Sequence, residues 1–219
     1  MDETVKPKRP DGQPRKASRD ARRQQLINST IATIGRCGYA KTTLTEVARN
    51  AGLSHGLINF HFQTKEQLLS DTLLFLMNEY RDNWIRALHE AGPRPADQLA
   101  ALLRADFNEV ICTEEKRTAW VAFWGEAQSR PVYQAMCGPM DQEYALRLEE
   151  ICANLVSEGG YAMKSEDAAR VLRAMLEGIW LELVRSVSRY SLAVAERTAF
   201  TAAAALFPKH FTAGGPIPA

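Results

Sequence analysis

The segment Thr42–Leu69 constrains the fold of this chain more than any other stretch. It reads TTLTEVARNAGLSHGLINFHFQTKEQLL, a pattern of short helices separated by tight turns. Thr43 and Glu46 form a capping box, so one helix begins there. Gly52 ends that helix because glycine can adopt a positive φ, and Ser54 caps the next helix. The segment therefore predicts two short helices joined by a sharp turn, followed by a third helix.

The first two of these helices have the spacing of a helix-turn-helix. A small residue at Ala48 lets the two helices cross closely, Gly52 makes the turn, and Ile58 packs the second helix against the core. The second helix is left with one exposed face, and such a face can enter the major groove of duplex DNA. The spacing therefore predicts a unit that reads DNA.

The charges of the chain are divided unevenly along its length. Residues 1–65 hold 12 Lys and Arg against 5 Asp and Glu, a balance of +7, whereas the remaining residues have a balance of −6. The net charge of +1 alone would argue against a nucleic-acid partner. A basic first part joined to an acidic remainder instead favours one part for DNA and one for another task. The alternative is an ordinary helical domain with a solvated basic end.

This segment resembles the DNA-binding domain of the Tet repressor family of bacterial transcriptional regulators. The resemblance rests on Thr43, Leu44, Val47, Ala48, Ala51, Gly52, Leu53, Ser54, Gly56, Ile58, Phe62, Lys65, Glu66, Leu68 and Leu69. The chain departs from the family pattern at Asn59 and His61, where tyrosine is common. The resemblance implies a helix-turn-helix regulator that forms a dimer and binds double-stranded DNA.

Sequence specificity is expected from the helix that follows Ser54. Asn59 can pair with two atoms of an adenine edge, and Leu57 can meet a thymine methyl group. Lys65 and His61 are placed for phosphates, although an exposed surface lysine and a half-buried packing histidine are the alternatives. The residues predicted to contact DNA are Thr43, Ser54, His55, Gly56, Leu57, Asn59, His61 and Lys65.

The whole chain is predicted to be all-α, with an N-terminal helix-turn-helix domain and a C-terminal helical domain for ligand binding and dimerisation. Residues 1–17 lack periodicity and are rich in Pro, Lys and Arg, which predicts a disordered basic arm. That arm either lies in a minor groove or remains a solvated tail. The DNA-binding domain is placed at 18–64, the effector-binding and dimerisation domain at 65–211, and a loop-like tail at 212–219.

The second domain is predicted to consist of long helices only. Thr64 and Gln67 form a capping box that begins a helix toward Ala91. Further helices are predicted at 96–111, 115–129, 131–158, 165–188 and 193–207. The pair Gly138–Pro139 is expected to kink or split the third of these. The sequence carries no strand signal.

The cysteines and histidines predict neither a metal site nor a cofactor. Cys37, Cys112, Cys137 and Cys152 are scattered without a C-x-x-C pair, and the four histidines do not cluster with them. This pattern is typical of reduced thiols in a cytoplasmic protein. No run of about 18 apolar residues occurs, so we expect no membrane span, and the N-terminus lacks the apolar stretch of a secretory signal.

An aromatic cluster in the second domain suggests a ligand pocket. Trp120, Phe123 and Trp124 share one face of a helix, and Trp180 lies on a later helix near an acidic residue. Aromatic faces around a carboxylate suit a quaternary ammonium through cation–π attraction, whereas the alternative is an aromatic stripe in the core. The residues predicted to bind the effector are Asp106, Trp120, Phe123, Trp124, Tyr133, Glu177 and Trp180.

Two segments resemble the effector domain of the BetI-like branch of the Tet repressor family. They are Ala119–Trp124, reading AWVAFW, and Glu177–Leu181, reading EGIWL. Aspartate is usual in that branch at Glu177, and a basic residue is usual at Glu182. The resemblance implies a choline-like cation as the small-molecule effector.

A single recognition helix discriminates weakly, so useful operator affinity normally needs two. We therefore expect a homodimer on a palindromic operator, with recognition helices about one DNA turn (~34–36 Å) apart. The interface is predicted on two apolar stripes, although both could pack within one subunit instead. The stripes are Ala168, Val171, Leu172, Met175, Ile179 and Leu183, and Phe200, Ala203, Ala204 and Phe207.

The sequence thus favours a ligand-responsive transcriptional regulator, a repressor that a small molecule releases from DNA. One alternative is a helical adaptor whose apolar stripes hold another protein. A second alternative is an enzyme acting on a cationic metabolite, with an acid/base set drawn from Asp106, Glu126 and Glu177. The chain has no nucleophile triad or phosphate loop, so no catalytic residue is predicted.

Overall fold

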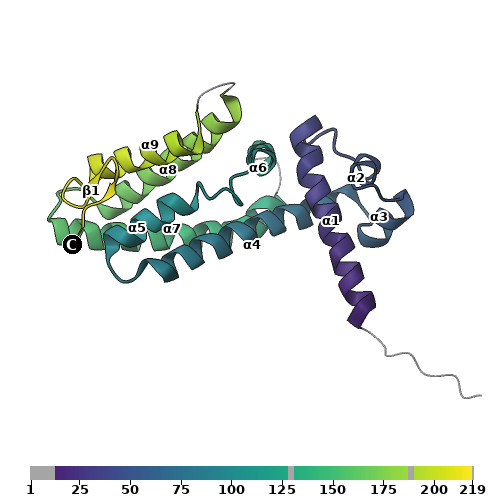
Figure 1. Cartoon of the computed structure of the whole chain (residues 1–219), viewed down its shortest axis with the longest axis horizontal. Helices are drawn as coiled ribbons and strands as arrows, with labels where there is room; N and C mark the ends of the chain where they lie inside the picture. The colour runs from purple at the N-terminus through teal and green to yellow at the C-terminus, as the bar shows by residue number, and fades with distance from the viewer. Residues whose placement is uncertain (1–12, 128–130, 187–189, 219) are drawn as a thin grey trace, which may run out of the picture.

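The computed structural model describes residues 13–127, 131–186 and 190–218. This part of the chain forms nine α-helices, arranged as a small head and a larger body that one long helix joins (Figure 1). The predicted all-α class is confirmed. None of the helices in the described ranges is long and apolar enough to cross a membrane.

The head consists of the first three helices and leads directly into the long helix. They are α1 (Gln13–Cys37), α2 (Leu44–Asn50), α3 (His55–His61) and then α4 (Lys65–Ala91). The body continues with α5 (Pro95–Ala105), α6 (Glu114–Ala127), α7 (Pro131–Gly159), α8 (Ser165–Arg185) and α9 (Leu192–Leu206). A small antiparallel hairpin closes the chain, with β1 (Phe211–Thr212) paired to β2 (Gly215–Pro216).

The predicted helix starts of the head are confirmed by their capping contacts. The Thr43 hydroxyl accepts the Glu46 backbone N–H at 3.2 Å, and the Ser54 hydroxyl accepts a backbone N–H of α3 at 3.3 Å. The Thr64 hydroxyl caps α4 in the same way at 3.1 Å. Gly52 has a φ of 66°, as its place in the turn requires. These caps satisfy backbone groups that would otherwise lack partners at the helix ends.

Several predicted boundaries differ from the structure. Helix α1 begins at Gln13, inside the arm predicted to be disordered, because Pro14 is compatible with a first helical turn and good helix formers follow it. Helix α5 ends at Ala105, and the Asn108 side chain then accepts a backbone N–H at 2.9 Å, which favours a turn over continued helix. Helix α7 runs through Pro139 without a split.

The C-terminal hairpin was not predicted because each strand has only two residues, too few for an alternating pattern. Its strand Phe211–Thr212 packs against α9. The Arg94 guanidinium ties the same segment to the body by donating to the Ile217 carbonyl at 2.8 Å.

Buried apolar side chains form one continuous cluster from the head into the body. In the head, Val47, Ala48 and Ile58 are buried between the helices, as the helix-turn-helix spacing predicted. Leu68 and Leu69 at the start of α4 extend this cluster toward the body. The position of the head is therefore connected to the packing of the body through α4.

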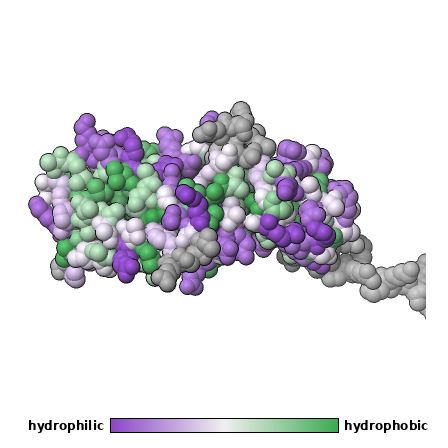
Figure 2. All heavy atoms as spheres, turned by 90° about the horizontal axis from the view of Figure 1, so that it is seen from above, coloured by the Kyte–Doolittle hydropathy of each residue, from purple (hydrophilic) through white to green (hydrophobic). Residues whose placement is uncertain are grey.

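The predicted dimer stripes are largely buried within their own subunit, so that prediction was wrong about the face. Most of their residues, such as Leu172 and Phe200, belong to the core. Of the stripe on α8, Val171 is 51% exposed, and the outward face of this helix carries it together with Ala174, Gly178 and Leu181. Figure 2 looks down on the side where α8 and α9 lie, and green and pale atoms interrupt the polar surface there.

We expect opposite effects from alanine at two neighbouring exposed glycines. Gly52→Ala should destabilise the fold by roughly 1–2 kcal/mol, because its φ of 66° is unfavourable for a residue with a Cβ although the space is open. Gly56→Ala should stabilise α3 by about 0.5–1 kcal/mol, because alanine is the better helix former. Thermal unfolding followed by circular dichroism measures both, and shifts of equal sign would contradict this account.

Candidate functional site

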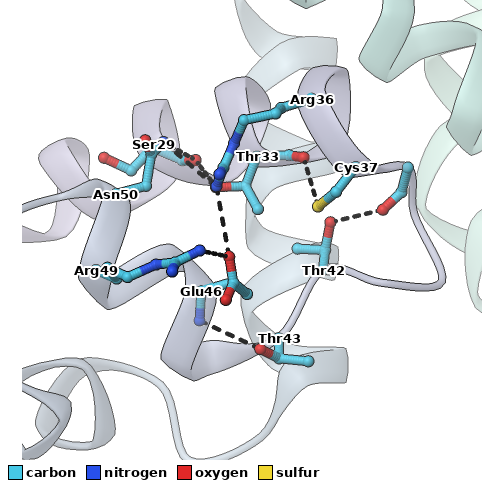
Figure 3. A network of polar contacts seen from close by, with 10 residues as sticks. Ser29, Thr33, Arg36, Cys37, Thr42, Thr43, Glu46, Arg49 and Asn50 are labelled. Carbon is cyan, nitrogen blue, oxygen red and sulfur yellow. Dashed lines mark hydrogen bonds and ion pairs between the residues drawn. The ribbon is translucent and has the colours of Figure 1, made fainter.

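A polar network fixes α2 against α1 (Figure 3), and α2 is followed after a tight turn by α3, which we call the reading helix. The Asn50 amide donates to the Ser29 carbonyl at 3.2 Å and to the Thr33 hydroxyl at 3.3 Å. Glu46 forms ion pairs with both Arg36, at 3.5 Å, and Arg49. These contacts hold α2, the first helix of the helix-turn-helix, against α1.

Helix α3 presents one face outward, and that face carries most of the residues predicted to contact DNA. Its buried side is anchored by Ile58, while His55, Gly56 and Asn59 are exposed and Leu57 is partly exposed. Thr43 and Ser54 are exposed as well, and their hydroxyls serve as helix caps.

Lys65 and His61, two of the predicted phosphate contacts, are each influenced by neighbouring groups of the protein. The Lys65 ammonium donates to the carbonyls of Tyr39, at 3.2 Å, and Ala40, at 2.9 Å. Burial, with the charges of Arg19 and Arg23, lowers the pKa of His61, so its imidazole is neutral near pH 7. Lys65 thus stabilises the loop after α1, and His61 can approach a phosphate as a neutral N–H donor.

Two residues beside this face were missed in the sequence. Phe60 is 64% exposed, and the Arg19 guanidinium lies 5.3 Å from its ring centroid. The N-terminal part of α1 therefore brings positive charge next to the end of α3. The basic run at the start of the chain was the available signal, but the contact between Arg19 and Phe60 depends on the tertiary fold, which the sequence pattern does not give.

The body contains a pocket of about 340 Å³ between α4, α6, α7 and α8. Five of the predicted effector residues line it together: Asp106, Trp120, Trp124, Glu177 and Trp180. Phe123 does not line it, because its ring packs edge-on against Tyr39 at 5.6 Å. The side chain of Tyr133 lies outside the described residues, as does that of Glu126.

Four aromatic rings surround one part of this pocket, and we call them the four-ring cage: Tyr80, Trp120, Trp124 and Trp180. Neighbouring ring centroids are 6.3 Å (Tyr80–Trp120 and Trp120–Trp124) or 6.4 Å (Trp124–Trp180 and Trp180–Tyr80) apart. If the four centroids stand at the corners of a square with such sides, its centre is about 4.5 Å from each ring, within the roughly 6 Å over which a cation is attracted to a ring. The cage therefore suits a small organic cation.

A buried carboxylate lies against this cage. Asp106 is 3% exposed and accepts a hydrogen bond from the Tyr80 hydroxyl at 2.6 Å. Burial raises the pKa of Asp106 to about 7, while the hydrogen bond from Tyr80 acts in the opposite direction. Burial and the nearby Asp106 charge raise the pKa of Tyr80 well above its usual value, so that hydroxyl stays protonated.

The rim of the pocket carries ion pairs that satisfy one another. Arg173 lies 3.1 Å from Glu177 and 3.9 Å from Asp141. Arg81, which also lines the pocket, forms two hydrogen bonds with Glu143, at 2.6 and 2.8 Å. Carboxylates outnumber guanidiniums in the lining, which favours a cationic ligand over an anionic one.

The fold and the two sites define a helix-turn-helix regulator with a separate ligand pocket. Residues 26–72 match the model described as bacterial regulatory proteins of the tetR family, and residues 95–208 match that of the BetI-type transcriptional repressor C-terminal domain. The chain belongs to the TetR family of DNA-binding transcriptional regulators, with a C-terminal domain of the BetI type.

Individual relatives agree with this assignment. The HTH-type transcriptional regulator BetI of Escherichia coli K12 is 30% identical over 177 residues, which cover 79% of this chain and 87% of the relative. A transcriptional regulator from Pseudomonas aeruginosa PAO1 has a similar structure, with a TM-score of 0.73 and 26% identity over 88% of this chain and 95% of that one. A regulator from Saccharomonospora viridis, solved in complex with choline, shares the fold at a TM-score of 0.71 and 16% identity, covering 82% of this chain and 94% of that one.

The buried Asp106 should make stability depend on pH. Its pKa is about 7 in the folded state and 3.8 when unperturbed, so between these values the folded chain binds a proton that the unfolded chain does not. The free energy of unfolding should therefore fall as pH rises through this window and level off above it. Asp106→Asn should remove this part of the decrease between about pH 5 and pH 8 in urea unfolding.

The matched control is Asp97→Asn. The hydrogen bond from Arg94 lowers the pKa of Asp97, so Asp97 stays ionised across the same pH window. The Asp97→Asn variant should therefore keep the wild-type dependence of the free energy of unfolding on pH. If the free energy of unfolding depended on pH equally in the wild type and in Asp106→Asn, the raised pKa of the buried Asp106 would be contradicted.

Proposed function

We propose that this chain is a homodimeric repressor in the cytoplasm that binds a palindromic operator and is released by a quaternary ammonium such as choline. The head reads DNA and the helices from α4 onward bind the effector and hold the dimer, a division proposed at residues 18–64 and 65–211. The observation that carries the proposal is that α4 begins beside the reading helix and also supplies Tyr80 to the four-ring cage.

The effector class follows from the chemistry of the pocket. Aromatic faces attract a quaternary ammonium without requiring hydrogen bonds from it, and Asp106 supplies a compensating charge within the same pocket. The choline complex of the Saccharomonospora viridis regulator supports this class because that protein shares the fold. The BetI-type C-terminal domain is consistent with this class, since the resemblance of the two aromatic segments to the BetI-like branch implies a choline-like cation.

The dimer is proposed on the outward face of α8 together with α9. Val171, Ala174, Gly178 and Leu181 lie at helical spacing on one exposed face, and their mostly small side chains permit close approach of a second helix. Two such faces from two subunits would form a four-helix interface with two-fold symmetry. A two-fold dimer matches a palindromic operator because each recognition helix then meets an equivalent half-site.

Helix α6 offers a route by which the pocket can act on the head. It contacts α1 on one side and α8 on the other. Trp120 and Trp124 face the pocket, whereas Phe123 from the same helix packs against Tyr39 at a centroid distance of 5.6 Å. The Tyr39 carbonyl in turn accepts a hydrogen bond from Lys65 at the start of α4.

An effector that changes the position of α6 would therefore move the loop that orients the reading helix. The effector acts only to the extent that it prefers one of the two arrangements of the heads, typically by about 1–3 kcal/mol of coupling. We propose that effector binding changes the distance between the two heads of the dimer, so that the two recognition helices no longer match the spacing of the operator half-sites.

The reading role is tested with Asn59→Ala and DNA from the region flanking the gene. Wild-type affinity, measured by fluorescence anisotropy, should fall steeply with salt because bound phosphates release counterions, and two chains should bind each operator. Asn59→Ala should lose about 1–3 kcal/mol of discrimination at one base pair of each half-site. Asn78→Ala, on the exposed surface of α4, should change nothing, and salt-independent binding would refute the DNA-reading role.

The route through α6 is tested with two adjacent residues that face different ways. Trp124→Leu should abolish choline binding while preserving operator affinity, because its ring belongs to the cage. Phe123→Leu should still bind both choline and operator, but the roughly 5–150-fold change in DNA affinity on adding choline should shrink to a few-fold. Calorimetry and anisotropy measure the two binding steps, and full coupling in Phe123→Leu would exclude the route through Tyr39.

A further inference from the structure

The Tyr144 side chain of α7 carries a buried hydroxyl group for which the four-ring cage gives no role. Tyr144 is 7% exposed and lines the pocket, and its hydroxyl has no hydrogen-bond partner among the described residues. Buried polar groups in proteins are nearly always hydrogen-bonded, so such an atom calls for an explanation.

The neighbouring polar groups do not provide the missing partner. The Tyr80 hydroxyl gives its proton to Asp106 at 2.6 Å, so toward Tyr144 it can act only as an acceptor, and it supplies no donor to the Tyr144 oxygen. Arg173 pairs with Glu177 at the rim. The other buried atom without a partner in the described ranges is Arg117 Nε, and Arg117 does not line the pocket. Tyr144 thus keeps hydrogen-bonding capacity that a ligand in the pocket can use.

The ring of Tyr144 has a role that phenylalanine could fill equally well. It packs against Tyr80 with a centroid distance of 5.9 Å and edge-on against Trp84 at 5.6 Å. Packing therefore accounts for an aromatic ring at this position but not for its oxygen. A hydroxyl can both donate and accept, so its partner can be a hydroxyl or a carbonyl oxygen.

We propose that the Tyr144 hydroxyl hydrogen-bonds an oxygen of the effector while the four-ring cage holds the cationic end. This inference rests on the proposed function and narrows it to cations that carry a hydroxyl or carbonyl oxygen near the ammonium. The contact with Tyr80, a corner of the cage, places Tyr144 beside the cation site. Tyr144 is therefore a specificity-determining residue that separates oxygen-bearing cations from purely alkyl ones.

The experiment compares three probes by calorimetry on the full chain. Choline carries the oxygen, n-propyltrimethylammonium replaces it with a methyl group, and tetramethylammonium fills the cage alone. Wild type should bind choline about ten-fold more tightly than the propyl compound, because the propyl compound leaves the buried hydroxyl unpaired. In Tyr144→Phe this preference should fall to about two-fold or less, with tetramethylammonium affinity unchanged.

Tyr161→Phe is the matched control, because it removes a hydroxyl that bonds His210 and the Lys209 backbone outside the pocket. It should keep the ten-fold preference. A wild type that binds all three probes without preference, or a Tyr144→Phe variant that keeps the preference, would overturn the role of Tyr144 alone. A wild type that binds none of the probes would overturn the proposed effector class and this inference with it.

Discussion

A carboxylate buried against aromatic rings is the interaction on which the effector site depends. Removing Asp106 from water disfavours its charged form, and burial raises its pKa to about 7. The carboxyl group must then hold a proton or lie near a compensating cation. The surrounding rings attract the same kind of ligand through their faces. Charge and shape in the pocket would therefore favour one chemical class of ligand, the cationic class of the proposed function, and Tyr80 links Asp106 to helix α4.

The same packing makes it possible for the pocket and the head to be coupled. Helix α4 has 27 residues and so spans about 40 Å, from the reading helix to the far side of the body. Its start is held by Lys65 to the loop after α1, and its middle faces the pocket. Packed interiors transmit small displacements because they contain little free space. Under the proposed function, a ligand that shifts α4 or α6 would therefore change the position of α3 without contacting it.

The local parts of this structure could be predicted from the sequence, and the tertiary parts could not. Helix caps such as Ser54 depend on neighbouring residues, so their pattern was sufficient. Trp120 and Trp124 were correctly placed in one pocket because they lie one turn apart. Phe123 was not, because adjacent helical residues project about 100° apart and the sequence does not reveal how a helix is rotated. Tyr80 and Tyr144 were missed because they come from helices distant in sequence. The prediction of the dimer interface was wrong for a similar reason, because the most apolar face of α8 packs into the core of its own subunit.

Lys65 connects the start of α4 to the loop after α1, a contact that the sequence did not suggest. A cation in the first turn of a helix is unfavourable beside the helix dipole, and a DNA phosphate was the expected compensation. The structure supplies two carbonyl oxygens instead, those of Tyr39 and Ala40. Because Phe123 contacts the same Tyr39, the first residue after the reading unit and the helix that lines the effector pocket meet at a single loop. The short segment after α1 is therefore the place where a change in the pocket would first alter the presentation of α3.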